Sequence, residues 1–358
     1  MQSPAHTETR AIATVDLSSF FKTPIQLLPD PEQLEAGREL VSALFDLGFV
    51  QLIGHGVSQQ EIDEALAWNK KLFDLPYAEK MKAPHPAAAT PHRGYSGIGK
   101  EKVYSQADVK AHGDEINVGQ SLRKISDFKA SPELFESYEI GSESDPVQPN
   151  IWLPEDVLPN FRSYMTALYE KLCDVSKVIL HAIAVGLGLF GPGYTSLIQL
   201  ISNRHCQLRL LHYPTISKEK LQNELLARLP AHQDWGTFTI LFQDSQGGLE
   251  LQDPSTETFL KAEPKDGACI LNIGDMLQRF SNDFFNSAVH RVSVPSPDTI
   301  PPTGIPPRYS IPFFVCPDSL HTISTLDKFV TEKNPAKYEP VRFDQYGSKI
   351  SQYQYQRD

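Results

Sequence analysis

Three side chains that can bind a metal ion occur in two short segments of the sequence. His232 and Asp234 stand two positions apart in HQDWGTFTILFQD, and His290 follows 58 positions after His232 in AVHRV. Alternate side chains of an extended strand point to the same face, so His232 and Asp234 can reach one ion. Two histidines and one carboxylate on one face leave other coordination positions open, which is typical of non-haem Fe(II) oxygenases rather than closed zinc sites.

A second pair of side chains, Arg308 and Ser310, lies in the apolar segment RYSIPFFV. Their spacing also places both side chains on one face of a strand. A guanidinium holds a carboxylate through two charge-assisted hydrogen bonds, and a serine hydroxyl can donate another. The pair therefore predicts a site for the far carboxylate of a 2-oxo diacid whose other end reaches the metal.

Each of these motifs is common when it occurs alone. The chain has 11 histidines, and an isolated His-x-Asp is more often a surface or core pair than a metal site. The order of the motifs carries the argument: a strand-like run after His232, then His290, then Arg308 and Ser310 inside an apolar segment. In this combination, we expect one mononuclear iron site with an anion-binding cosubstrate.

Beyond these motifs, the sequence resembles the isopenicillin N synthase-like family of non-haem Fe(II)/2-oxoglutarate-dependent dioxygenases. The resemblance runs from about Ile12 to about Asp318 and includes the segments IATVDLSSF, GFVQLIGHGV, RGYSGIGKE and LRLLHYP. It implies a mainly β fold, with a double-stranded β-helix (jelly-roll) core and an N-terminal α/β region packed around it. It also implies Fe(II), 2-oxoglutarate and O2, and the oxidation of a C–H bond of a small molecule in secondary metabolism, by hydroxylation, desaturation or ring formation.

The resemblance assigns roles to further residues. Tyr213 matches a tyrosine that hydrogen-bonds the cosubstrate in many relatives, whereas Leu211 replaces an asparagine that often accompanies it. Tyr95 and Tyr104 lie in a segment that borders the substrate side of the cavity, and Phe314 matches an aromatic residue of the substrate pocket. For these last three residues, simple packing in the protein core is the alternative.

Other functions stay open at this point. Members of the same family use O2 without 2-oxoglutarate, or fragment 2-oxoglutarate itself to ethylene, and Arg308 and Ser310 are compatible with both. From another class, the chain could be a non-catalytic small-molecule-binding protein on the same barrel. The intact set of three metal ligands argues against that alternative, because a binding protein does not need them.

The chain divides into five expected parts. We expect a flexible N-terminus at 1–11, a region of helices, loops and some strands at 12–150, a long supporting helix within 151–200, the jelly-roll core at 201–325 and a C-terminal tail at 326–358.

Local patterns predict several elements of the N-terminal region. An amphipathic helix ends at Gly48 and precedes a strand at Phe49–Ile53. Ser58 and Glu61 form the sequence signature of a capping box, which predicts a second helix.

Other segments have weaker or longer-range patterns. The apolar run Ile12–Phe20 predicts a strand, the polar segment 125–150 predicts irregular structure, and a long helix begins near Leu158. Short strand-like runs follow beyond Gly191. Within them, Asn272 is interpreted as structural.

Composition restricts the partners. The net charge of −11 over 358 residues argues against nucleic acid or an anionic membrane as a partner. The four cysteines are widely spaced and lack any zinc-like pattern, so we expect reduced thiols. The first residues lack a secretory-type apolar core. We therefore expect a cytoplasmic enzyme with a small-molecule substrate, as a monomer or weak homo-oligomer.

Overall fold

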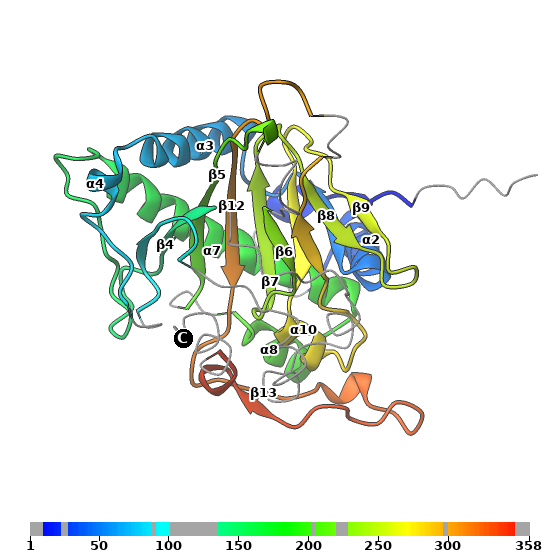
Figure 1. Ribbon diagram of the computed structural model, residues 1–358. Helices are drawn as coiled ribbons and strands as arrows, with labels where there is room; N and C mark the ends of the chain where they lie inside the picture. The colour runs from blue at the N-terminus through cyan, green and yellow to red at the C-terminus, as the bar shows by residue number, and fades with distance from the viewer. Residues whose placement is uncertain are drawn as a thin grey trace, which may run out of the picture.

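Two β-sheets form the centre of the molecule (Figure 1). The computed structural model describes residues 10–22, 28–87, 91–100, 135–201, 205–219, 228–295 and 300–347. In spatial order, the large sheet consists of β1 (Thr14–Asp16), β2 (Phe49–Ile53), β10 (Cys269–Ile273), β7 (Phe238–Gln243), β12 (Arg308–Val315), β5 (Gln207–Tyr213), β4 (Glu136–Ile140) and β3 (Gly94–Ser96). The small sheet consists of β6 (Leu229–His232), β11 (His290–Val292), β8 (Leu249–Gln252) and β9 (Phe259–Lys261).

A cluster of buried apolar side chains joins the two sheets. It includes Phe49 and Leu211 from the large sheet and Leu251 and Val292 from the small sheet. Two sheets that face each other in this way bury the inward residues of each strand. The arrangement is that of the jelly roll, as the sequence predicted, and the site described below lies between its sheets.

Helices cover the other face of the large sheet (Figure 1). The described helical segments are α1 (Ser18–Lys22), α2 (Pro31–Leu47), α3 (Gln59–Phe73), α4 (Tyr77–Lys80), α7 (Phe161–Gly186), α8 (Gly191–Ile198), α10 (Asp275–Phe280) and the 3-10 helix η2 (Asp327–Phe329). Near the C-terminus, β13 (Thr322–Ile323) and β14 (Val341–Arg342) form a separate antiparallel pair.

The ends of α2 and α3 follow the predictions from the sequence. Gly48 adopts the left-handed conformation (φ 72°) and its N–H donates to the carbonyl oxygen of Leu44, which ends α2. Ser58 accepts from the N–H of Glu61, and the Glu61 carboxylate accepts from the N–H of Ser58 at 2.9 Å. The predicted capping box is therefore confirmed.

Strand β4 contradicts the expectation of irregular structure at 125–150 for its own five residues, whereas 141–150 forms no helix or strand and 125–134 lies outside the described residues. Its five residues are all buried, and it pairs with β5 and β3. Its glutamates have cationic partners: the Glu136 carboxylate forms an ion pair with Lys80 at 2.7 Å, and Glu139 forms one with Arg209 at 2.6 Å. The prediction failed because these partners lie far away in the sequence.

The predicted strand at Ile12–Phe20 is also only partly correct. Strand β1 covers Thr14–Asp16, and α1 begins at Ser18. The Asp16 carboxylate accepts hydrogen bonds from the N–H of Ser18 at 2.8 Å and from its hydroxyl at 2.6 Å. Such local bonds from an aspartate favour a turn over a continued strand.

The N-terminal segment expected at 1–11 lies outside the described residues, except for Arg10 and Ala11. Arg10 forms an ion pair with Asp253 at 2.9 Å. Within the described residues, no helix has the length and apolar character needed to cross a membrane. The five-part division of the chain stays a prediction.

Candidate active site

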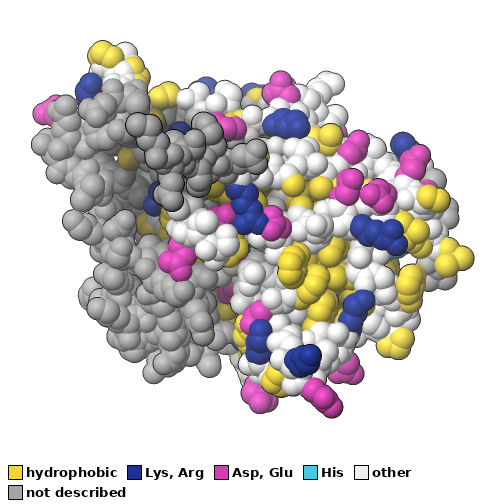
Figure 2. All heavy atoms as spheres, turned by 90° about the vertical axis from the view of Figure 1, so that its right-hand side faces the viewer, with side chains coloured by type: hydrophobic (Ala, Val, Ile, Leu, Met, Phe, Trp, Pro, Cys, Tyr) yellow, Lys and Arg dark blue, Asp and Glu magenta, His cyan; other side chains and the backbone are white. Residues whose placement is uncertain are grey.

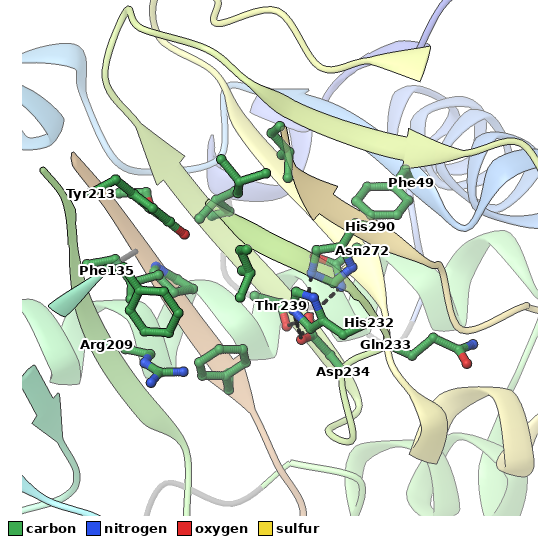
Figure 3. Close-up of a pocket in the computed structure, with 18 of the residues that line it drawn as sticks. Phe49, Phe135, Arg209, Tyr213, His232, Gln233, Asp234, Thr239, Asn272 and His290 are labelled. Carbon is green, nitrogen blue, oxygen red and sulfur yellow. Dashed lines mark hydrogen bonds and ion pairs between the residues drawn. The ribbon is translucent and has the colours of Figure 1, made fainter. Parts of the chain in front are cut away.

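The strand pairing of the small sheet brings the three candidate metal ligands together. His232 ends β6, His290 begins β11, and the two residues lie directly opposite each other in this antiparallel pair. Asp234 follows β6, and its Oδ1 lies 4.0 Å from His232 Nε2 and 3.8 Å from His290 Nε2 (Figure 3). The Nδ1 atoms face the carbonyl oxygens of Pro230 at 2.9 Å and Ala288 at 3.0 Å. With Nδ1 donating, each Nε2 keeps its lone pair for a metal.

The carboxylate of Asp234 is held from the large sheet. Its Oδ2 accepts hydrogen bonds from Thr239 Oγ1 at 2.6 Å and from Asn272 Nδ2 at 2.7 Å. Thr239 and Asn272 lie opposite each other in the β7–β10 pair, so their side chains reach the same oxygen. Oδ1 is left to face the histidines. Asn272 thus orients a candidate ligand, a role that its interpretation as structural missed.

The protonation states fit a divalent metal ion. Burial and the electrostatic interaction with His290 lower the pKa of His232 to about 4, so its imidazole is neutral at neutral pH. Burial acts to raise the pKa of Asp234, but its interactions with the histidines, Thr239 and Asn272 bring the pKa below its usual value. A neutral imidazole and an ionised carboxylate are the forms that coordinate metals. The set of nitrogen and oxygen donors fits Fe(II).

Arg308 is a buried cation at another part of the same pocket. Its Nε donates to the carbonyl oxygen of Gly247 at 2.8 Å, Nη1 to Ser310 Oγ at 2.9 Å and Nη2 to Gln243 Oε1 at 3.0 Å. The ring of Tyr213 lies 5.0 Å from its Cζ. All these partners are neutral, and no carboxylate in the described part of the chain forms an ion pair with Arg308. A buried charge without a counter-ion is costly, so this arrangement favours an anionic ligand.

One pocket contains the metal-ligand cluster and the Arg308–Ser310 pair. Aromatic side chains form much of the remaining wall, namely Phe49, Phe135, Trp235 and Phe314. Arg209 and Phe135 lie on the side of the pocket opposite the candidate metal ligands (Figure 3). The pocket therefore combines a metal centre, an anion site and an apolar wall with one further cation.

The three residues predicted for the substrate pocket have different positions. Phe314 lines the pocket. Tyr95 is buried but does not line this pocket. Its hydroxyl donates to Glu136 Oε2 at 2.5 Å. Tyr104 lies outside the described residues. The substrate contacts of Tyr95 and Tyr104 stay predictions.

Arg209 and Trp235 are among the pocket residues that reasoning from the sequence missed. Arg209 alternates with Leu211 and Tyr213 along β5, and all three line the pocket. The two-residue period of a strand, applied back from Tyr213, could have identified it. Trp235 directly follows Asp234, and no pattern in the sequence indicated that it lines the pocket.

Comparisons with known proteins bear on most of the chain. The family model described as "non-haem dioxygenase in morphine synthesis N-terminal" matches residues 12–155, and that of the "2OG-Fe(II) oxygenase superfamily" matches residues 204–317. A "2-oxoglutarate-Fe(II) type oxidoreductase ppzD" of Metarhizium majus is 37% identical over 87% of each chain. The chain belongs to the 2OG-Fe(II) oxygenase superfamily. This oxygenase is also 35% identical to the "Proline hydroxylase buaE" of Petromyces alliaceus, over 84% of this chain and 87% of that one.

Solved structures agree with this assignment. The oxygenase is similar to T7H of Neurospora crassa in complex with alpha-KG, with a TM-score of 0.78 and 29% identity over 95% of this chain and 96% of that one. The complex of T7H with alpha-KG and thymine has a TM-score of 0.76 and 30% identity over 96% of each chain.

The predicted family, fold class and reaction class are confirmed. The protein is a 2-oxoglutarate-dependent dioxygenase that uses Fe(II), 2-oxoglutarate and O2. Membership of this enzyme family argues against the alternative of a non-catalytic binding protein.

Proposed function

We propose that this oxygenase oxidises a C–H bond of a small organic molecule in the pocket between its two sheets. The residues that we assign are the Fe(II) ligands His232, Asp234 and His290 and the 2-oxoglutarate-binding residues Arg308, Ser310 and Tyr213. The observation that supports this proposal most strongly is the buried guanidinium of Arg308, which has neutral partners and shares a pocket with the ligand cluster.

We assign a separate role to each side chain of the site. When bound, Fe(II) and 2-oxoglutarate supply oxidation chemistry that no amino-acid side chain offers. The hydrogen bonds from Thr239 and Asn272 keep Oδ1 of Asp234 directed at the metal position. Arg308 and Ser310 fix the far carboxylate of the cosubstrate. Burial raises the pKa of Tyr213, so its hydroxyl stays protonated and can donate a hydrogen bond.

The strand register separates a cosubstrate end from a substrate end of the pocket. Arg308 pairs with Tyr213, whereas Phe314 pairs with Gln207 near the other end of β5. Arg209 and Tyr213 are four residues apart, which corresponds to about 13 Å along a strand. We place the substrate near Phe314, Arg209 and Trp235, where the aromatic walls exclude water from the reacting C–H bond.

The relatives support a small-molecule substrate. One is a proline hydroxylase, and T7H has been solved with thymine. Hydroxylation, desaturation and ring formation are all compatible with the pocket. We also propose a role in secondary metabolism, which the related fungal enzymes support. We further propose that the enzyme works in the cytoplasm and is a monomer or weak homo-oligomer. The net charge of −11 supports the absence of a nucleic-acid partner.

The residue assignments can be tested without knowing the substrate. Metal-free protein is titrated anaerobically with Fe(II) and then with 2-oxoglutarate, and the visible charge-transfer band of the chelated 2-oxo acid is recorded. The variants are His232→Ala and Arg308→Gln. The controls are His321→Ala and Arg342→Gln, which replace the same residue types outside the pocket.

Each variant has its own expected result. His232→Ala should lose the band, and Arg308→Gln should keep it but need at least tenfold more 2-oxoglutarate, since a charge-assisted pair is removed. Both controls should resemble the wild type. An unchanged titration of Arg308→Gln would refute the cosubstrate assignment, and a normal band in His232→Ala would refute the metal site.

A further inference from the structure

The pocket contains two arginines whose surroundings differ. Arg308 is bonded to neutral groups, as described above. Arg209 instead has a carboxylate partner, because its Nε lies 2.6 Å from Glu139 Oε1. Glu139 and Arg209 lie opposite each other in the β4–β5 pair, so the backbone register itself places these charges together.

Arg209 reaches the pocket while Glu139 stays behind it. The side chain of Arg209 is 16% exposed and that of Glu139 is 0% exposed. The guanidinium carbon of Arg209 lies 5.5 Å from the ring centroid of Phe135, which also lines the pocket (Figure 3). The Nη2 of Arg209 donates to Ser137 Oγ at 3.3 Å. A ligand in the pocket can thus meet the exposed part of this guanidinium, with the negative charge of Glu139 directly behind it.

Other described groups also lie beside Glu139. Its other oxygen, Oε2, accepts from the amide of Gln207 and lies 3.7 Å from His92 Nε2. Burial lowers the pKa of His92 well below its usual range, so this imidazole is neutral. Arg93 is a further described cation in this region, and its Nη2 lies 3.5 Å from Asp145 Oδ2. Among the described residues, Arg209 and Glu139 form one ion pair and Arg93 and Asp145 form another.

This pairing changes what Arg209 can recognise. A carboxylate placed at Arg209 would be attracted by the guanidinium but repelled by Glu139, and it would lose its hydration on entering the pocket. A neutral carbonyl oxygen accepts hydrogen bonds from the same N–H groups without the repulsion between two full negative charges. The contrast with Arg308, whose described partners are neutral, separates an anion site from a carbonyl site within one pocket.

We infer that Glu139 makes the substrate end of the pocket selective for neutral molecules that present a carbonyl oxygen to Arg209, such as amides, imides or lactams, over carboxylates. The inference rests on the proposed function, because it requires the substrate to lie at Arg209 and the cosubstrate at Arg308. Glu139 acts through Arg209 as a specificity-determining residue and does not touch the substrate.

The test compares two probes of the same shape, benzamide and benzoate. Both are titrated into the anaerobic enzyme saturated with Fe(II) and 2-oxoglutarate, and binding is followed by calorimetry and by the change in the visible band. The wild type should bind benzamide at least tenfold more tightly than benzoate. Glu139→Gln should lower the Kd of benzoate at least tenfold. Glu143→Gln, which alters another ion-paired glutamate outside the pocket, should behave as the wild type.

Several results would overturn the inference. They are a wild-type preference for benzoate, the absence of benzamide binding to the wild type, and an unchanged ratio of the two Kd values in folded Glu139→Gln. If Glu139→Gln does not fold, Arg209→Gln decides the question, because it should abolish the wild-type preference for benzamide. Failure of the wild type to bind 2-oxoglutarate would defeat the proposed function as well, whereas a normal complex with an unchanged ratio would defeat the inference alone.

Discussion

The hydrogen bond from Thr239 to Asp234 should control metal affinity. Thr239→Val keeps the shape of the side chain and removes the hydroxyl that donates to Asp234 Oδ2 at 2.6 Å. The carboxylate keeps only its bond from Asn272 on this oxygen and gains freedom to rotate. A hydrogen bond to a charged group contributes about 1.5–3 kcal/mol, and loss of such an outer partner typically costs about 10–100-fold in metal affinity. We expect the Kd for Fe(II) to rise by about that factor.

The matched control is Thr237→Val. Thr237 is also fully buried, and its hydroxyl donates to the carbonyl oxygen of Leu200 rather than to Asp234. Both variants lose one buried hydrogen bond, so both should unfold at a lower temperature. Anaerobic calorimetry with Fe(II) separates them, because only Thr239→Val should bind the metal more weakly. If the two variants bind Fe(II) within twofold of the wild type, the argument that Thr239 positions Asp234 is wrong.

Three further predictions concern stability. Ser58→Ala removes the cap of α3 and should cost about 1 kcal/mol in urea unfolding. The hydrogen bond from Lys171 and those from Ser58 lower the pKa of Glu61 to about 2. Its stabilisation is therefore present above the unfolded-state pKa, at about 4.3, and is lost as the pH falls towards 2. Glu61→Gln should destabilise the protein at pH 7 by less than about 1 kcal/mol, because the pair is partly exposed, and by nothing near pH 2 in thermal unfolding. Gly186→Ala would drive a methyl group into the carbonyl oxygen of Gly37, and we expect a loss of about 1–3 kcal/mol or more in urea unfolding.

Features with a local cause could be predicted from the sequence. The end of α2 at Gly48 and the start of α3 at Ser58 depend on residues within one turn of the chain. The two-residue spacing of His232 and Asp234 likewise predicted that both side chains can reach one metal ion. That His290 lies directly opposite His232 was not predicted, since spacing alone does not determine strand pairing.

Features with a distant cause were missed. Strand β4 reads as polar and irregular because its glutamates look like surface residues until their partners are known. Glu139 pairs with Arg209, which is 70 positions away, and Glu136 pairs with Lys80, which is 56 positions away. The role of Asn272 depended in the same way on β10 lying beside β7. No local pattern contains this information.

Strand pairing also fixes the relative positions of the residues that line the pocket. Phe314 lies opposite both Gln207 and Thr239, so a single register ties the substrate end to the residue that holds Asp234. A shift of one residue in β12 would turn Arg308 and Ser310 out of the pocket together. The cosubstrate site is therefore tied to the fold. Glu139 is different, because its substitution by glutamine changes the charge behind Arg209 without altering the register. We therefore expect Glu139→Gln to change substrate preference while the proposed metal and cosubstrate sites stay as they are.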